Sequence, residues 1–122
     1  LINLPDGRER HTLLDVCRRH VEDTGAVLLE RYPPGWAEHA QSGTSALGPV
    51  ELTLELGSLV DGVRSAVATY RLGDQVWRQA FSMVDVDDER LAREAAAHGL
   101  RIDRVIDAAR TWIVLRPDGS PS

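Results

Sequence analysis

The spacing of apolar residues predicts a helix near the start of the chain. Between residues 8 and 22, apolar side chains recur at helical spacing, and charged side chains occupy the other face. Asp6, followed three residues later by Glu9, resembles a capping box, and Gly25 supplies a turn beyond the last apolar position. We therefore expect a helix from about Arg8 to Glu22. Its apolar positions are Leu13, Leu14, Cys17 and Val21.

A short apolar run, Ala26–Leu29, follows without any alternation. Such a run is typical of a strand that is covered on both faces, as in a parallel sheet. Glu30, Arg31 and Tyr32 end the run, and two prolines then stop the strand because proline has no N–H to donate. Ligands bind at the carboxyl edge of open α/β sheets. The run therefore predicts a buried strand that delivers polar side chains to a ligand site, and the alternative is that these are simply the first solvated residues after the strand.

The pattern changes to period two in the middle of the chain. Trp36–Pro49 is rich in small and polar residues with no clear period, which favours a mobile loop that carries function. Apolar and polar residues then alternate over Val50–Leu56, which predicts a strand with one dry and one wet face. Two further candidate strands, Val63–Leu72 and Gln75–Val84, flank a Gly-Asp turn. We expect an antiparallel meander over residues 50–84.

The last third of the chain predicts a helix followed by two strands. Several acids in Asp85–Arg90 precede apolar positions, which suits a helix N-terminus where negative charge offsets the macrodipole. His98 and Gly99 close this helix. Leu100–Ile106 reads as a strand, and Thr111–Leu115 reads as a second strand that is buried on both faces.

Composition limits the classes of protein to consider. The chain has 122 residues, about one domain, and a single cysteine, so no intrachain disulfide is possible. Its net charge is −5 with no basic stripe, which argues against nucleic acid as a partner. No apolar run is long enough to cross a bilayer, so we expect a soluble, cytoplasmic protein without a membrane partner. Leu1 and Ile2 read as the end of a strand, which favours a fragment of a larger domain.

Metal-binding and hydrolase motifs are weak in this sequence. His11, Cys17 and His20 lie on one predicted helix, but His11 does not share the face of the other two, which favours structural roles over zinc binding. The acids between Asp85 and Glu89 lack the glycine and the closing glutamate of a calcium loop. No serine lies in a nucleophile elbow. We predict no metal site, and no catalytic residue is assigned.

The order of these elements resembles the C-terminal half of class I S-adenosylmethionine-dependent methyltransferases. In that family, a helix that ends before a PGG-type turn precedes the fifth strand, and Asp23–Gly25 occupies the position of that turn. A later helix with an A-x-x-x-G-L-like end and two strands resemble the family's terminal β-hairpin. The matching positions are Leu91, Ala97, Gly99 and Leu100. The resemblance covers nearly the whole chain.

The resemblance implies an α/β fold. It would be the C-terminal part of a Rossmann-like methyltransferase sheet, with an antiparallel β-meander insertion at residues 50–84 and a terminal β-hairpin. Residues 1–122 would form a single domain that is part of a larger methyltransferase domain. The meander would cover the substrate side of the sheet.

The resemblance also implies transfer of a methyl group from S-adenosylmethionine to a small-molecule acceptor. The family holds this cofactor with a glycine-rich turn after the first strand and an acid after the second, and this sequence contains neither, so the isolated chain should bind the cofactor weakly and be inactive. Leu1–Pro5 would be the exit of the fourth strand, with Asn3 and Leu4 beside the cofactor. The expected acceptor-binding residues are Arg31, Tyr32 and Trp36. The missing N-terminal half or a second copy of the chain would be the protein partner.

A second function from a different class remains open. The chain would then be a non-catalytic α+β binding or dimerisation module, in which the meander forms an interface and no cofactor is used. The coding sequence upstream of Leu1 separates the two hypotheses. A glycine-rich strand, turn and helix there would favour the enzyme, and a start codon at that point would favour the module.

Overall fold

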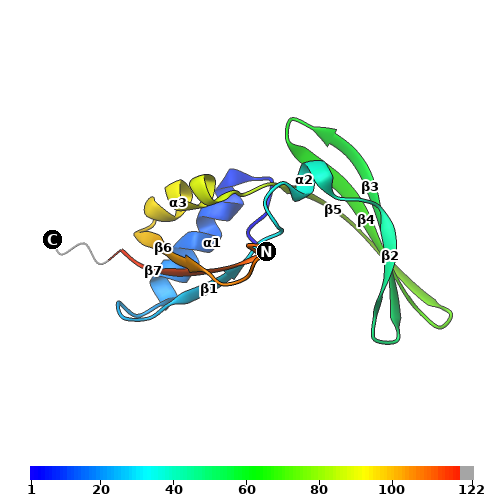
Figure 1. The fold of residues 1–122 in the computed structure, drawn as a ribbon, viewed down its shortest axis with the longest axis horizontal. Coiled ribbons are helices and arrows are strands. Elements are labelled where there is room, and N and C mark those ends of the chain that lie inside the picture. The colour runs from blue at the N-terminus through cyan, green and yellow to red at the C-terminus, as the bar shows by residue number, and fades with distance from the viewer. Residues whose placement is uncertain (119–122) are drawn as a thin grey trace. The chain divides into compact units, whose positions relative to one another are not determined.

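The computed structural model describes residues 1–118 and has a mixed α/β architecture with two antiparallel sheets. The chain divides into two compact units. The first contains Leu1–Pro34 together with the chain from Asp85 onward, and the second contains Gly35–Val84 (Figure 1). The expectation of a single domain stays a prediction.

The first unit combines two helices with a three-stranded sheet of order β1-β7-β6, and both strand pairs are antiparallel. Helix α3 packs against β6 and against α1. The predicted terminal hairpin is therefore present as β6 and β7. The elements are α1 (Gly7–His20), β1 (Val27–Glu30), α3 (Asp88–Ala96), β6 (Leu100–Val105) and β7 (Trp112–Pro117).

Both longer helices begin at the positions that the sequence predicts. The Asp6 side chain accepts a hydrogen bond from the backbone N–H of Arg8 at 2.9 Å, and the Asp87 side chain accepts one from the N–H of Arg90 at 2.8 Å. These caps satisfy backbone donors that have no partner within the helix. Leu14 of α1 and Leu91 and Ala95 of α3 are buried. The core of this unit includes Ile2, Leu14, Leu91, Ala95, Leu100, Ile113 and Leu115.

The position of β1 differs from the expectation. The sequence predicts a strand covered on both faces, but Leu28 is 58% exposed and only Leu29 of this strand is buried. The prediction is wrong because β1 is an edge strand of the described sheet, paired with β7 alone. One backbone hydrogen bond, from Ile2 N–H to the Glu30 carbonyl at 3.2 Å, brings the N-terminal segment alongside the end of β1.

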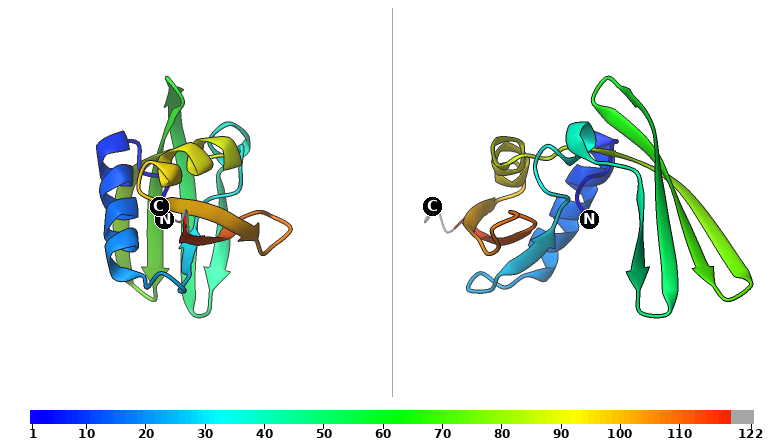
Figure 2. Two further views of the ribbon diagram at one scale, coloured as in Figure 1. Left: turned by 90° about the vertical axis from the view of Figure 1, so that its left-hand side faces the viewer. Right: turned by 45° about the vertical axis from the view of Figure 1, so that its right-hand side comes forward.

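The second unit is a four-stranded antiparallel sheet of order β2-β3-β4-β5 with one short helix. Figure 2 shows its long strands from two further directions. The predicted meander is confirmed, and β4 and β5 have the predicted bounds. The elements are α2 (Trp36–His39), β2 (Gly43–Leu47), β3 (Val50–Val60), β4 (Val63–Leu72) and β5 (Gln75–Val84).

The expected mobile loop over Trp36–Pro49 is wrong. Its first residues form α2, and Gly43–Leu47 forms β2, which pairs with β3 through a turn at Gly48 with φ of 59°. All five residues of β2 are exposed. Neither face of this strand is buried, and the sequence therefore shows no alternation of apolar and polar residues.

The strand register separates the two faces of this sheet. Leu52 lies opposite Tyr70, which lies opposite Trp77, so these side chains share one face. The neighbouring row contains Glu51 and Arg71 on the other face. We call the side that carries Leu52, Tyr70 and Trp77 the apolar sheet face, although Arg64 near the start of β4 also lies on it. Its large side chains are Leu47, Val50, Leu52, Leu54, Leu56, Tyr70, Leu72, Trp77 and Phe81.

Candidate functional site

The carboxyl end of β1 meets the N-terminal segment Leu1–Pro5. The Asn3 side-chain Oδ1 accepts a hydrogen bond from the backbone N–H of Tyr32 at 2.7 Å, and Asn3 is buried. The sequence analysis assigned Asn3 to the cofactor and Tyr32 to the acceptor, and the structure brings the two residues together. Their roles in binding cofactor and acceptor stay predictions.

Arg31 is buried at the same end of β1 and is 1% exposed. Its guanidinium donates to the Arg110 carbonyl at 2.9 Å through Nε and to the Val86 carbonyl at 2.8 Å through Nη1. Its Nη2 forms an ion pair with Asp88. The side chain therefore joins the end of β1 to the start of α3 and to the turn between β6 and β7. Contact with an acceptor stays a prediction for Arg31.

Asp88 receives two guanidinium groups, because Arg110 also forms an ion pair with it. Partial burial alone would raise the pKa of Asp88, but the hydrogen bonds and charges of Arg31 and Arg110 outweigh that effect and hold the pKa below its ordinary value. The carboxylate is consequently ionised at neutral pH. It compensates the charge of the buried Arg31, which an apolar environment would otherwise disfavour.

The turn between β6 and β7 is fixed by Asp107. Its carboxylate accepts hydrogen bonds from the Thr111 hydroxyl, from the Thr111 N–H at 2.9 Å and from the Trp112 N–H at 2.8 Å. These bonds lower the pKa of Asp107 below its ordinary value. The same turn presents the Thr111 carbonyl to the Arg31 N–H at 2.8 Å. Asp107 therefore holds Thr111 in place as the partner of the Arg31 backbone.

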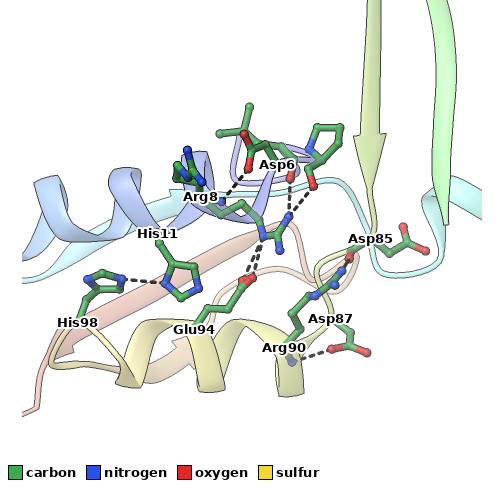
Figure 3. A network of polar contacts seen from close by, with 11 residues as sticks. Asp6, Arg8, His11, Asp85, Asp87, Arg90, Glu94 and His98 are labelled. Carbon is green, nitrogen blue, oxygen red and sulfur yellow. Dashed lines mark hydrogen bonds and ion pairs between the residues drawn. The ribbon is translucent and has the colours of Figure 1, made fainter. Parts of the chain in front are cut away.

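A buried ion pair between α1 and α3 also holds the N-terminal segment (Figure 3). Arg10 Nε on α1 lies 2.7 Å and 3.1 Å from the two carboxylate oxygens of Glu94 on α3. Arg10 Nη1 also donates to the Leu4 carbonyl at 2.7 Å and to the Pro5 carbonyl at 3.2 Å. One guanidinium thus ties both helices to the segment that carries Asn3 and Leu4.

Sequence reasoning missed this pair, although a local signal exists. Arg10 lies four residues before Leu14 and therefore falls on the apolar stripe of α1. Glu94 lies three residues after Leu91 and falls on the apolar stripe of α3. Two opposite charges, each in the middle of an apolar stripe, are the pattern of a buried ion pair between two helices.

The remaining predicted site residues are placed as follows. Leu4 is half-buried and follows Asn3 in the N-terminal segment. Trp36 is the first residue of α2 and belongs to the second unit, so its place beside Tyr32 stays a prediction.

Among residues 1–118, no three His, Cys, Asp or Glu side chains are grouped as metal ligands would be. No helix within the same residues combines the length and apolar character that a membrane span requires.

The fold is similar to that of several solved methyltransferases. An S-adenosylmethionine-dependent methyltransferase from Clostridium acetobutylicum matches with a TM-score of 0.74 at 11% identity, over 93% of this chain and 53% of its own. The sugar N-methyltransferase KedS8 from Streptoalloteichus matches with a TM-score of 0.68 at 14% identity, over 93% and 50%. CalS10, an amino pentose methyltransferase from Micromonospora echinaspora solved with bound S-adenosylmethionine, matches with a TM-score of 0.58 at 15% identity, over 93% and 53%.

These matches confirm the resemblance to methyltransferases at the level of the fold. The chain spans about half the length of each of these structures. No protein-family model matches the sequence, and no curated protein matches it.

Proposed function

We propose that the chain is the C-terminal half of an S-adenosylmethionine-dependent methyltransferase that acts on a small molecule. The observation that carries this proposal is the match of 93% of the chain to about half of each of several methyltransferase structures. The sheet order β1-β7-β6, with Leu1–Pro5 beside the end of β1, supports a Rossmann-like C-terminal part. In this proposal the full-length protein is the enzyme, it is cytoplasmic, and neither nucleic acid nor membrane is a partner.

The residues at the end of β1 would form one wall of the reaction site. The Asn3 Oδ1 and the Leu4 carbonyl are already bonded within the protein, so the Leu4 side chain would supply apolar contact to the cofactor. S-adenosylmethionine, when bound, would supply the methyl group from its sulfonium. Tyr32 would contact the acceptor, with Arg31, its neighbour in the chain, as a positioning residue, and Trp36 is a further candidate for acceptor contact. Methyl transfer needs alignment and exclusion of water more than acid and base groups.

The isolated chain is expected to bind S-adenosylmethionine weakly. In the resembled family a glycine-rich turn and a ribose-binding acid hold the cofactor, and residues 1–122 contain neither motif. Titration calorimetry of the chain, alone and mixed with the segment encoded upstream of Leu1, measures the affinity. We expect no saturable binding by the chain alone and saturable binding by the mixture.

Low-micromolar binding by the chain alone would show that its own residues form the cofactor site and would contradict the proposed division of the site. Absence of binding by the mixture, with both segments folded, would contradict the methyltransferase proposal itself.

The apolar sheet face favours a second candidate function, a dimerisation module. Arg64, near the start of β4, is the charged strand residue on this face, and its guanidinium donates to the Ala37 and Gly57 carbonyls. Leu47, Leu72 and Trp77 on the same face are each more than 40% exposed. Three strands roughly 33 Å long and one of about half that length, spaced about 4.8 Å apart, offer about 550 Å² of surface. That area approaches the ~800 Å² per partner of a stable interface. A symmetric contact between two copies that leaves Arg64 at its edge would bring no like charges together.

Trp77→Glu is expected to convert such a dimer into a monomer, because it places a charge within the apolar contact. Val76→Glu is the matched control, since Val76 is 42% exposed and is the next residue along the same strand, on the opposite face. Light scattering at high protein concentration measures the mass of each variant. A monomer for the unmodified chain, or a dimer that Trp77→Glu leaves intact, would remove this candidate.

A further inference from the structure

Two histidines that lie 87 positions apart in the sequence form a direct hydrogen bond. His11 Nδ1 on α1 lies 2.8 Å from His98 Nε2, in the turn that follows α3 (Figure 3). The ring centroids are 5.0 Å apart, with a tilt of 49° between the rings. The proposed methyltransferase function uses neither of these side chains, and the role proposed for them does not depend on that function.

A hydrogen bond between two imidazoles needs one N–H and one lone pair. The neutral pair satisfies this requirement, because one ring donates and the other accepts. With one added proton, an imidazolium donates to a neutral ring, which gives a stronger, charge-assisted bond. With two added protons, both facing nitrogens carry hydrogen and both rings are positive. The distance of 2.8 Å therefore accommodates one added proton and excludes the second.

The charged groups around the pair reinforce this difference. Asp15, one turn after His11 on α1, pairs with Arg19 through Oδ2 at 3.1 Å. Its Oδ1 lies 3.9 Å from His98 Nδ1 and favours the first positive charge. Arg18, also on α1, lies beside Gly99 and disfavours a second one. Glu94 on α3 is occupied by Arg10. On β6, Arg101 and Asp103 form an ion pair with each other, and Arg116 of β7 also pairs with Asp103.

We propose that His11 and His98 form a one-proton joint that holds α1 against the end of α3 and opens when both rings are protonated. Arg10 is next to His11, and Glu94 is one turn before His98, so the joint and the buried ion pair lie in the same contact between the helices. Opening of the joint loosens the hold of Arg10 on the Leu4 and Pro5 carbonyls. Acidification thereby weakens the contacts that hold the segment carrying Asn3.

Urea unfolding of the chain between pH 7.5 and 5.0 tests the proposal. Free histidine titrates near pH 6.5, so below about pH 6 the unfolded chain binds one proton more than the folded pair. The unfolding equilibrium constant should then rise about tenfold per pH unit. His11→Asn and His98→Asn should each remove this dependence. His20→Asn, at an exposed position on the same helix, is the matched control and should retain it.

Two further measurements cover the other outcomes. In ¹⁵N spectra of the unmodified chain, the two rings should not both be protonated while the hydrogen bond between them persists. Protonation of both rings while the hydrogen bond between them persists would overturn the proposal, as would a pH dependence that survives in both histidine variants. The titration is repeated with Zn²⁺ and with a chelator. A zinc-dependent stabilisation that both histidine variants lose would assign the pair to a metal instead.

Discussion

Glu94→Gln is expected to lower the free energy of unfolding by about 3 kcal/mol, because it leaves the guanidinium of Arg10 buried without a compensating charge. Arg10 and Glu94 are each 6% exposed, and Arg10 Nε contacts both carboxylate oxygens. Glutamine preserves the shape of the side chain, so the loss reports the charge and not the volume. Urea unfolding followed by far-ultraviolet circular dichroism measures the change.

Asp23→Asn is the matched control for this prediction. Asp23 pairs with Arg18, but its side chain is 89% exposed, and such pairs contribute less than about 1 kcal/mol. A double replacement, Arg10→Met with Glu94→Leu, removes both buried charges and should recover part of the loss. Recovery stays incomplete because the Leu4 and Pro5 carbonyls lose their donor. If Glu94→Gln costs no more than Asp23→Asn, the two helices are not joined by a buried pair.

Features that depend on neighbouring residues could be predicted from the sequence. Asp6 and Asp87 cap the two helices as expected, because capping needs only a side-chain oxygen and the next turn of backbone. The alternation along Val50–Leu56 and the turn at Gly73 gave β3, β4 and β5 in an antiparallel meander. Each of these signals lies within about ten residues of the structure that it specifies.

Features that depend on distant residues could not be predicted in the same way. Strand β2 has no buried face, and backbone pairing with β3 alone orders it, so its side chains show no period. The apolar run at β1 indicated a strand but not its neighbours, and the described sheet places it at an edge. Arg31 follows that strand and reads as solvated, yet groups 55, 57 and 79 residues away bury it.

The burial of Arg31 changes what its replacement would test. From the sequence alone, Arg31→Ala should leave folding intact, because a surface charge contributes little to the core. In the structure the replacement deprives two carbonyl groups, those of Val86 and Arg110, of their donor and empties the volume of a buried side chain. We therefore expect Arg31→Ala to lower the free energy of unfolding by about 4 kcal/mol.

Arg110→Ala is the matched control, because it removes the other guanidinium from Asp88 while its own side chain is 48% exposed. It should cost about 1 kcal/mol or less. Arg31→Lys should fall between the two, since a single ammonium cannot reach three acceptors in different directions. Urea unfolding of the three variants gives the order, and equal stabilities for Arg31→Ala and Arg110→Ala would contradict the buried position of Arg31. A loss of activity in Arg31→Ala would thus report folding, which leaves Tyr32→Phe as the cleaner test of acceptor binding at the end of β1.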